Sequence, residues 1–330
     1  MKSLIQKLTQ TPGPSGYEQE IRKVIREEIA PLSKSIQVDA LGSLIVRMGE
    51  KKPGGLRVMV AAHMDEIGVI VSHVEKKGFV RFSNLGSILP RYLAGGRVRF
   101  LNGVRGVINH DRSEELARIP GIEKYFIDVG ATSAKDCPVK VGDVAVFDRE
   151  FLDMGKRVSS KAMDDRVACA VLIETMRNIK KTPNELVFVF STQEEVQSRG
   201  AQTAAFAIEA DLGIAVDVTP SGDILGVKMQ VYLGQGPAIK VRDVGMIADP
   251  KVVKWMADTA KKNQITCQME VLDVGSTDAR TMQIARSGML AGALSIPCRY
   301  VHSPSELVDM DDITQTVKLL TALLSERIQL

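Results

Sequence analysis

The sequence predicts an α/β protein, with helices flanking a mixed sheet, that carries an all-β insertion. Segments of strand and helix character alternate near the start of the chain and again over its second half, which is typical of an α/β domain. The run 56–62 is continuously apolar, as expected of a strand covered on both faces. Between 68 and 158, short β-prone pieces are separated by Gly, Asn and Asp turns with little helical period.

The first α/β segment combines a helix with two strands. Ser15 and Glu18 have the spacing of a capping box, which predicts that a helix opens here. Apolar residues then mark one helical face, at Ile21, Val24, Ile25 and Ile29. Residues 43–48 and 56–62 read as strands. His63 follows where the second strand ends.

The insertion and the second α/β segment can also be divided into elements. In the insertion we expect strands at 69–74, 79–82, 97–100, 104–108 and 144–147. After it we expect helices at 165–179, 199–210, 250–262, 278–286 and 312–328, and strands at 186–191, 212–216, 269–272 and 290–296. We therefore predict one domain formed by 1–67 plus 159–330, split by a β domain at 68–158.

The composition excludes several classes of protein. The chain has 330 residues, 45% hydrophobic and 25% charged, close to the globular average, so a disordered or fibrous chain is not expected. A net charge of +3 arises from 43 basic and 40 acidic residues spread along the chain, with no basic stripe that would bind nucleic acid.

Neither disulfides nor membrane segments are predicted. The four cysteines are far apart and form no CxxC pair, at Cys137, Cys169, Cys267 and Cys298. The N-terminus lacks the apolar stretch of a signal peptide, and no apolar run approaches the length of a membrane span. We therefore expect a cytoplasmic protein that is not embedded in a membrane.

Two of the four histidines stand at places where α/β sheets carry their sites. His63 and His302 each follow a strand-like run, in MVAAHMDEIG and LSIPCRYVHSPSE, and ligands of open α/β sheets bind at the carboxyl ends of strands. His73 and His110 fall in the insertion, and we interpret them as surface or interface residues.

Carboxylates gather at similar positions. Asp164-Asp165, Glu194-Glu195 and Asp217 each border an apolar segment. One such pair is commonly a helix cap or a solvated surface pair. Three sets beside two histidines are harder to explain in that way, because buried carboxylates must be protonated, paired or bound to cations.

A pair of divalent metal ions satisfies this set of side chains. Two imidazoles and three carboxylates suit ions of the zinc or cobalt type, and a carboxylate can bridge them. Two dications, three ligand carboxylates and a bridging hydroxide sum to zero charge, which leaves one carboxylate free for proton transfer. Such a centre activates water, so the sequence predicts metal-assisted hydrolysis.

The motifs resemble those of one family. HMDEIG, KAMDDR, QEEV followed by RGA, AVDVT, GSTDA and SIPCRYVHSPSE occur in the order and approximate spacing of the tetrahedral (TET) aminopeptidases, and the match runs essentially end to end. These are glutamyl- or leucyl-aminopeptidase-like dinuclear metallopeptidases with a zinc-peptidase-like fold, and many members were once described as cellulases or endoglucanases. The resemblance implies a metallo-aminopeptidase.

The resemblance also implies roles for individual residues. Asp164 would bridge both ions. His63 and Asp217 would complete one metal site, and Glu195 and His302 the other.

Three further residues have expected roles beside the ligands. Glu194 would be the general base that takes a proton from the bridging water and delivers it to the leaving amine. Because adjacent residues of a strand point to opposite faces, we expect a loop at Glu194-Glu195. We group Asp65 with the catalytic residues, since it lies two residues after His63 and can accept a hydrogen bond from its imidazole. The resemblance also implies a cis peptide bond between Asp164 and Asp165.

The family motifs contain some less certain positions. Glu306 and Asp278 fall in them and are candidates for supporting polar residues, although acids at helix starts explain both equally well. Family members commonly have glycine in place of Gln197, which alters the backbone freedom of the loop after the base.

The family's β insertion is a dimerisation domain, which implies that 68–158 joins dimers into a hollow tetrahedral dodecamer admitting only short peptides.

Two other functions remain open. The first is a hydrolase of other N-acyl or glycosidic bonds. An N-acyl amino acid deacylase would use the same centre, whereas a glycosidase would need carboxylates that are free of metal. The second is a non-catalytic scaffold that keeps its metals, although the presence of Glu194 argues against it. The preferred N-terminal residue and the choice of metal stay undetermined.

Overall fold

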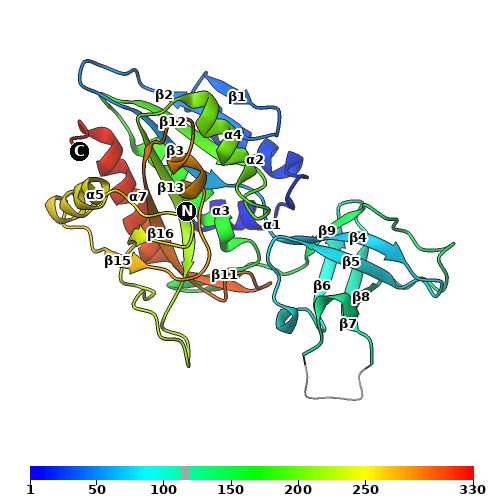
Figure 1. Ribbon diagram of the computed structural model, residues 1–330. Coiled ribbons are helices and arrows are strands. Elements are labelled where there is room, and N and C mark those ends of the chain that lie inside the picture. Colours follow the sequence, from blue (N-terminus) through cyan, green and yellow to red (C-terminus); the bar gives the residue numbers. More distant parts are fainter. Residues whose placement is uncertain (113–118) are drawn as a thin grey trace.

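The computed structural model describes residues 1–112 and 119–330. A large sheet with helices on both faces forms the main body, and a smaller β-barrel projects from one side of it (Figure 1). This is the predicted mixed α/β architecture with a barrel-like insertion.

The main sheet has parallel strands at its centre. β3 (Arg57–His63) lies between β12 (Glu185–Ser191) and β13 (Leu212–Pro220), and β13 pairs in turn with β16 (Leu290–Arg299), all in parallel. These four strands are almost entirely buried. Their carboxyl ends therefore meet at one edge of the sheet.

Antiparallel strands extend the sheet on both sides. One end adds β2 (Leu44–Met48) and β1 (Ile36–Val38), and the other adds β17 (Glu306–Asp309), β11 (Arg157–Ser160) and β10 (Leu152–Met154). A branch is formed by β14 (Ala238–Arg242), antiparallel to β16, and β15 (Gln268–Val271).

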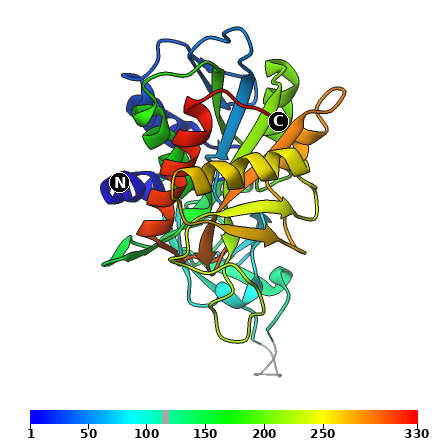
Figure 2. The same ribbon diagram turned by 90° about the vertical axis from the view of Figure 1, so that its left-hand side faces the viewer.

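Two helical layers cover the sheet. The larger core cluster packs one face against α1 (Lys2–Gln10), α2 (Gln19–Ile29), α3 (Met163–Asn178), α5 (Pro250–Lys262) and α7 (Met310–Ser325). The second cluster packs the other face against α4 (Arg199–Ile208) and α6 (Ala279–Gln283). Figure 2 shows α5 and α7 next to each other on the first face.

The insertion is a closed antiparallel barrel with its own core. The barrel order is β4 (Gly68–Val74), β5 (Val80–Leu85), β8 (Tyr125–Asp128), β7 (Arg105–His110), β6 (Arg97–Phe100) and β9 (Val144–Phe147). Two 3-10 turns, η1 (Pro90–Tyr92) and η2 (Ile122–Lys124), join its strands. The domain boundaries at 68 and 158 stay a prediction. Near the second boundary, β10 and β11 already pair within the main sheet.

The structure corrects two details near the N-terminus and in α6. The capping box is wrong: α2 begins at Gln19, and the hydroxyl of Ser15 donates to Asp65 instead, because tertiary partners compete for it. α6 ends at Gln283, short of the predicted 286.

The predicted cis peptide bond between Asp164 and Asp165 is present. Among the described residues, no helix combines the length and apolarity that crossing a membrane requires.

Candidate metal centre

Parallel strands bring the predicted residues together at one edge of the sheet. His63 is the last residue of β3, in register with Ser191 at the end of β12. Glu194 and Glu195 follow in the loop between β12 and α4, as expected from their adjacent positions. Asp217 lies near the end of β13, and His302 follows β16 in the turn before β17.

Asp164 lies between the two imidazoles. Its Oδ1 is 3.0 Å from Nε2 of His63, and its Oδ2 is 3.3 Å from Nε2 of His302. Asp164 precedes the regular turns of α3 with non-helical backbone angles, which place its side chain at the strand ends. One carboxylate thus presents an oxygen to each histidine.

Two more carboxylates complete the arrangement. Nε2 of His302 is 3.4 Å from Oε2 of Glu195, and Nε2 of His63 is 3.9 Å from Oδ1 of Asp217. The ligand atoms of His63, Asp164 and Glu195 all lie within 4.8 Å of one another. This spacing allows one ion to touch several of these side chains at once.

Glu194 lies beside this group and is held differently. Its Oε1 accepts a hydrogen bond of 2.8 Å from the hydroxyl of Ser198, while Oε2 is 4.0 Å from Nε2 of His63. Its side chain is 15% exposed, against 3% for that of Glu195. Glu194 is therefore open to an incoming molecule, whereas Glu195 is enclosed.

The electrostatics of the group show an excess of negative charge. Burial raises the pKa of Glu195 to about 8 and holds the pKa of Asp217 well above its usual range. Burial lowers the pKa of His302, but the carboxylates of Glu195 and Asp164 outweigh it and raise the value to about 10. A cluster of this kind gains stability from added cations.

The pattern of hydrogen bonds fits metal ions at this place. Oε1 of Glu195 and Oδ1 of Asp165 are buried with no hydrogen-bond partner among the described residues. Imidazole and carboxylate together are the donor set that zinc and cobalt prefer. These residues can therefore hold divalent ions.

Asp65 connects the imidazole to the neighbouring loop. Nδ1 of His63 is 3.2 Å from the backbone oxygen of Asp65 and 3.4 Å from its carboxylate. The carboxylate accepts hydrogen bonds from the backbone amides of Glu194 and Glu195 and from the hydroxyl of Ser15. Burial raises the pKa of Asp65, but the imidazole of His63, together with the hydrogen bonds from Ser15 and Glu194, outweighs burial and holds it below its usual value.

Three contacts support the predicted ligands and base, and sequence reasoning named only Glu306 among their acceptors. Asp165 accepts a hydrogen bond from the backbone amide of His63, Glu306 accepts from two backbone amides of the cluster, and Ser198 orients Glu194. The helix-start explanation is wrong for Glu306, which begins β17, whereas Asp278 does precede α6. The backbone amides that Glu306 and Asp165 bind are not revealed by a sequence.

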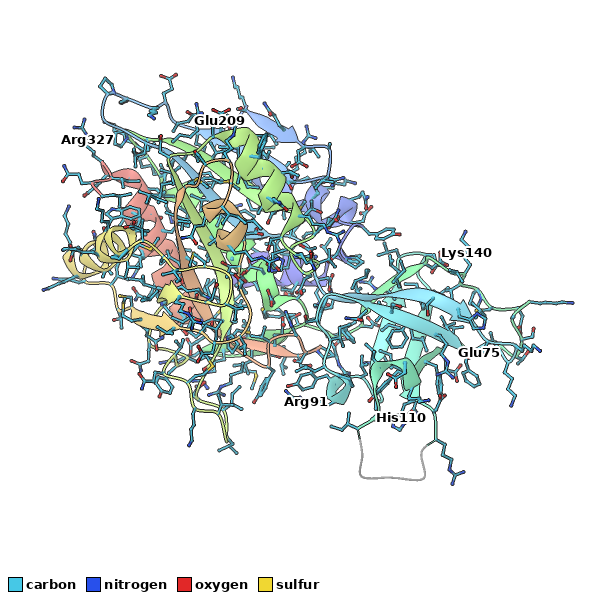
Figure 3. The ribbon with its side chains drawn as sticks, viewed as in Figure 1. Glu75, Arg91, His110, Lys140, Glu209 and Arg327 are labelled. Atoms are coloured by element: carbon cyan, nitrogen blue, oxygen red, sulfur yellow. The ribbon has the colours of Figure 1, made fainter. Side chains whose placement is uncertain are left out.

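The remaining histidines lie elsewhere. His73 and His110 belong to β4 and β7 of the barrel, and Figure 3 shows His110 there, away from the main sheet. Nδ1 of His110 is 2.9 Å from the backbone oxygen of Asp111, and Nε2 of His73 is 3.9 Å from Glu75.

Known proteins resemble this chain over almost its whole length. The family model of the M42 glutamyl aminopeptidases matches residues 42–319. A putative aminopeptidase of Acetivibrio thermocellus is 46% identical over 323 residues, which cover 97% of each chain.

Solved structures of aminopeptidases also resemble this chain. An aminopeptidase from Desulfurococcus kamchatkensis superimposes with a TM-score of 0.94 at 37% identity, covering 98% of this chain and 94% of that one. The TET1 peptidase of Pyrococcus horikoshii, which can assemble into a tetrahedron or a large octahedral shell, gives a TM-score of 0.88 at 33% identity and 99% coverage of both chains. This chain therefore belongs to the M42 glutamyl aminopeptidase family and is a hydrolase of peptide bonds.

Proposed function

We propose that the chain is a dinuclear metal-dependent aminopeptidase that releases the N-terminal residue of short peptides. The observation that carries the proposal is the position of Asp164, whose two carboxylate oxygens lie 3.0 and 3.3 Å from the two imidazoles. A carboxylate that faces two metal-binding groups in this way is suited to bridge two ions.

The remaining ligands divide between the two ions by proximity. His63 and Asp217 would hold one ion, because their nearest atoms are 3.9 Å apart. Glu195 and His302 would hold the other, at 3.4 Å. The donor set favours zinc or cobalt, and availability decides between such metals.

When bound, two such ions supply an activated water and polarise the scissile carbonyl. Glu194 is placed to take a proton from the attacking water and to return it to the leaving amine. Ser198 fixes one carboxylate oxygen of Glu194, so the other oxygen is the one presented toward His63.

Asp65 supports both sides of this arrangement. It is placed to orient the imidazole of His63 through Nδ1, and its hydrogen bonds with the amides of Glu194 and Glu195 fix the loop that carries the base and a ligand. We therefore propose that its effect on the reaction runs through the geometry of these neighbours.

The proposal extends to the assembly and the location of the protein. We propose that the barrel region joins dimers and that dimers build a tetrahedral dodecamer. A similar TET1 structure is a dodecamer, and the Pyrococcus horikoshii peptidase can form a tetrahedron or an octahedral shell, which supports a homo-oligomer. A cytoplasmic location agrees with four cysteines that are all free thiols.

Hydrolysis of aminoacyl p-nitroanilides tests the function. Metal-stripped protein is refilled with zinc, cobalt or manganese and given a panel of these substrates beside one N-acetylated control. We expect metal-dependent cleavage of the free-amine compounds alone, and the fastest substrate identifies the preferred residue. Cleavage of the acetylated compound alone would establish the deacylase instead, and retention of both metals without any cleavage of peptides would favour the scaffold.

A further inference from the structure

Glu306 connects two parts of the metal centre that are far apart in the sequence. It is the first residue of β17 and only 1% exposed. Its Oε2 accepts a hydrogen bond of 3.0 Å from the backbone amide of Asp164, and its Oε1 accepts one of 2.8 Å from the backbone amide of His302.

The fold explains why one side chain reaches both amides. Glu306 pairs with Ser160 at the end of β11, and the chain continues from there to Asp164. His302 lies in the short turn between β16 and β17, with a backbone φ of 62°. Glu306 therefore lies where the segment that carries Asp164 meets the turn that carries His302.

The chemistry of the contact requires a carboxylate. Both partners are N–H donors, so both oxygens of the side chain must accept. A glutamine in the same position would present its own NH₂ group to one of the two donors, and that amide would lose its acceptor. Because both oxygens bind backbone amides, Glu306 has no oxygen committed to a metal ion.

We propose that Glu306 is a positioning residue that fixes the bridging carboxylate of Asp164 relative to the imidazole of His302. The inference rests on the proposed function, because it assigns to Glu306 the geometry of one of the two metal sites. Its loss would disturb the ion held by Glu195 and His302 more than the ion held by His63 and Asp217.

Asp312 offers a matched control. It is fully buried in the first turn of α7, and its two oxygens accept hydrogen bonds of 2.7 Å from the backbone amides of Gly234 and Gly236. It thus makes the same kind of contact as Glu306, but to a loop that carries none of the proposed ligands. Asp312→Asn and Glu306→Gln both remove one acceptor from a buried pair of amides.

The test is a titration of metal-free full-length protein with Co²⁺, followed by calorimetry and by the visible absorption of the bound ion. We expect wild type to bind two ions per chain. Glu306→Gln should bind one ion with wild-type affinity and the other about 10- to 100-fold more weakly, with an altered absorption band. Asp312→Asn should bind both ions within about twofold of wild type, since supporting contacts outside the metal site do not orient the ligands.

A second variant keeps the test informative if Glu306→Gln does not fold. Glu306→Asp keeps two acceptor oxygens but is one methylene shorter, so it reaches one amide well and the other poorly. It should also weaken one ion selectively. Equal affinities in wild type and in the folded Glu306 variants, or equal weakening by Asp312→Asn, would overturn the inference.

The titration also distinguishes a failure of the proposed dinuclear function from a failure of the role proposed for Glu306. If wild type fails to bind two ions, the proposed dinuclear function is contradicted. If wild type binds two ions and the Glu306 variants match it, the positioning role alone is wrong.

Discussion

Residues 161–166 contribute to two groups of largely buried charged residues, whose charges are balanced in opposite ways. The ion-paired cluster consists of Glu66, Lys161 and Arg166, whose side chains are 2%, 3% and 0% exposed. The acidic cluster consists of His63, Asp164, Glu194, Glu195, Asp217 and His302.

The ion-paired cluster contains its own cations. Nζ of Lys161 lies 2.6 Å from Oε2 of Glu66, and Arg166 approaches Oε1 of the same carboxylate at 3.5 Å. Arg166 also donates to the backbone oxygens of Leu8 and Thr11, so the cluster ties the N-terminal segment to α3. Here the chain itself supplies the positive charge that burial of a carboxylate requires.

The acidic cluster has no such partner among the described residues. Its carboxylates outnumber its imidazoles, and burial raises the pKa of Glu195 and of Asp217. The difference teaches that a charge deficit of this kind is not a general property of buried polar groups in this protein. Several such carboxylates gather beside two imidazoles where metal ions are proposed to bind.

The largest expected effect is the loss of activity when the proposed base in the acidic cluster is replaced. Glu194→Gln should lower kcat by about 10²- to 10⁴-fold, because the group that transfers the proton is removed. Metal content, measured by elemental analysis, should stay at the wild-type value.

Glu195→Gln is the matched control for that variant, since it alters the adjacent position. It should lower metal content together with activity. Retained activity in Glu194→Gln, or loss of metal from it, would contradict the assignment of two different roles to these neighbours.

The next effect concerns the ion-paired cluster. Lys161→Met should lower the free energy of unfolding by about 3–5 kcal/mol, because Glu66 would stay buried without its nearer cation and keep only Arg166, at 3.5 Å. Urea unfolding should show this loss whether or not metal is present. Lys7→Met removes an exposed pair with Glu28 and should cost less than about 1 kcal/mol. If added metal restored the lost free energy of unfolding, the ion-paired cluster and the acidic cluster would be energetically coupled, contrary to this expectation.

The effect of metal on stability should grow with pH. Glu195 and Asp217 have pKa values raised in the folded state, so the folded metal-free protein holds protons that the unfolded chain has released. The stability contribution of Glu195 is complete below about pH 4 and is lost as pH rises toward about 8, with a slope of about 1.4 kcal/mol per pH unit for one proton, and Asp217 acts in the same direction.

Bound metal replaces those protons, so the rise in melting temperature on adding zinc should be larger at pH 8 than at pH 5. The raised pKa of His302 acts in the same direction as those of Glu195 and Asp217, whereas the lowered pKa of Asp164 affects stability only in the acid range. A metal effect that is constant over this range would show that the acidic cluster does not release protons to its ions.

The smallest effect concerns the loop of the acidic cluster. Gln197 has a φ of 89°, which favours glycine, so Gln197→Gly should raise the free energy of unfolding by about 0.5–1 kcal/mol. Gln202→Gly, on the exposed side of α4, should lower it by a similar amount. Thermal melts of the two variants should therefore shift in opposite directions, and a shift in the same direction would show that the φ of Gln197 is not strained.

The sequence predicted the elements that have a strong periodic signal. The apolar run before His63, the helix α5 and most barrel strands follow directly from such patterns. It did not predict β17 or β11, because short strands are defined by their partners. Ser15 and Glu18 failed as a capping box because Asp65 and the amide of Gln193 bind them in the folded chain.

The candidate site divides in the same way. Side chains such as Asp164 and His302 could be found from motifs, because metal binding selects their residue type. The contacts that position them, from Glu306 and Asp165 to backbone amides, depend on which strands become neighbours and leave no local pattern.

The central claim is that the acidic cluster works only with two divalent ions. Its most direct test adds zinc or cobalt back to metal-stripped protein in steps, while bound metal and the rate of aminoacyl p-nitroanilide cleavage are measured on the same samples. We predict negligible cleavage without metal and full activity at two bound ions per chain. Full activity in the stripped protein, or an activity that is complete with one ion per chain, would contradict the account.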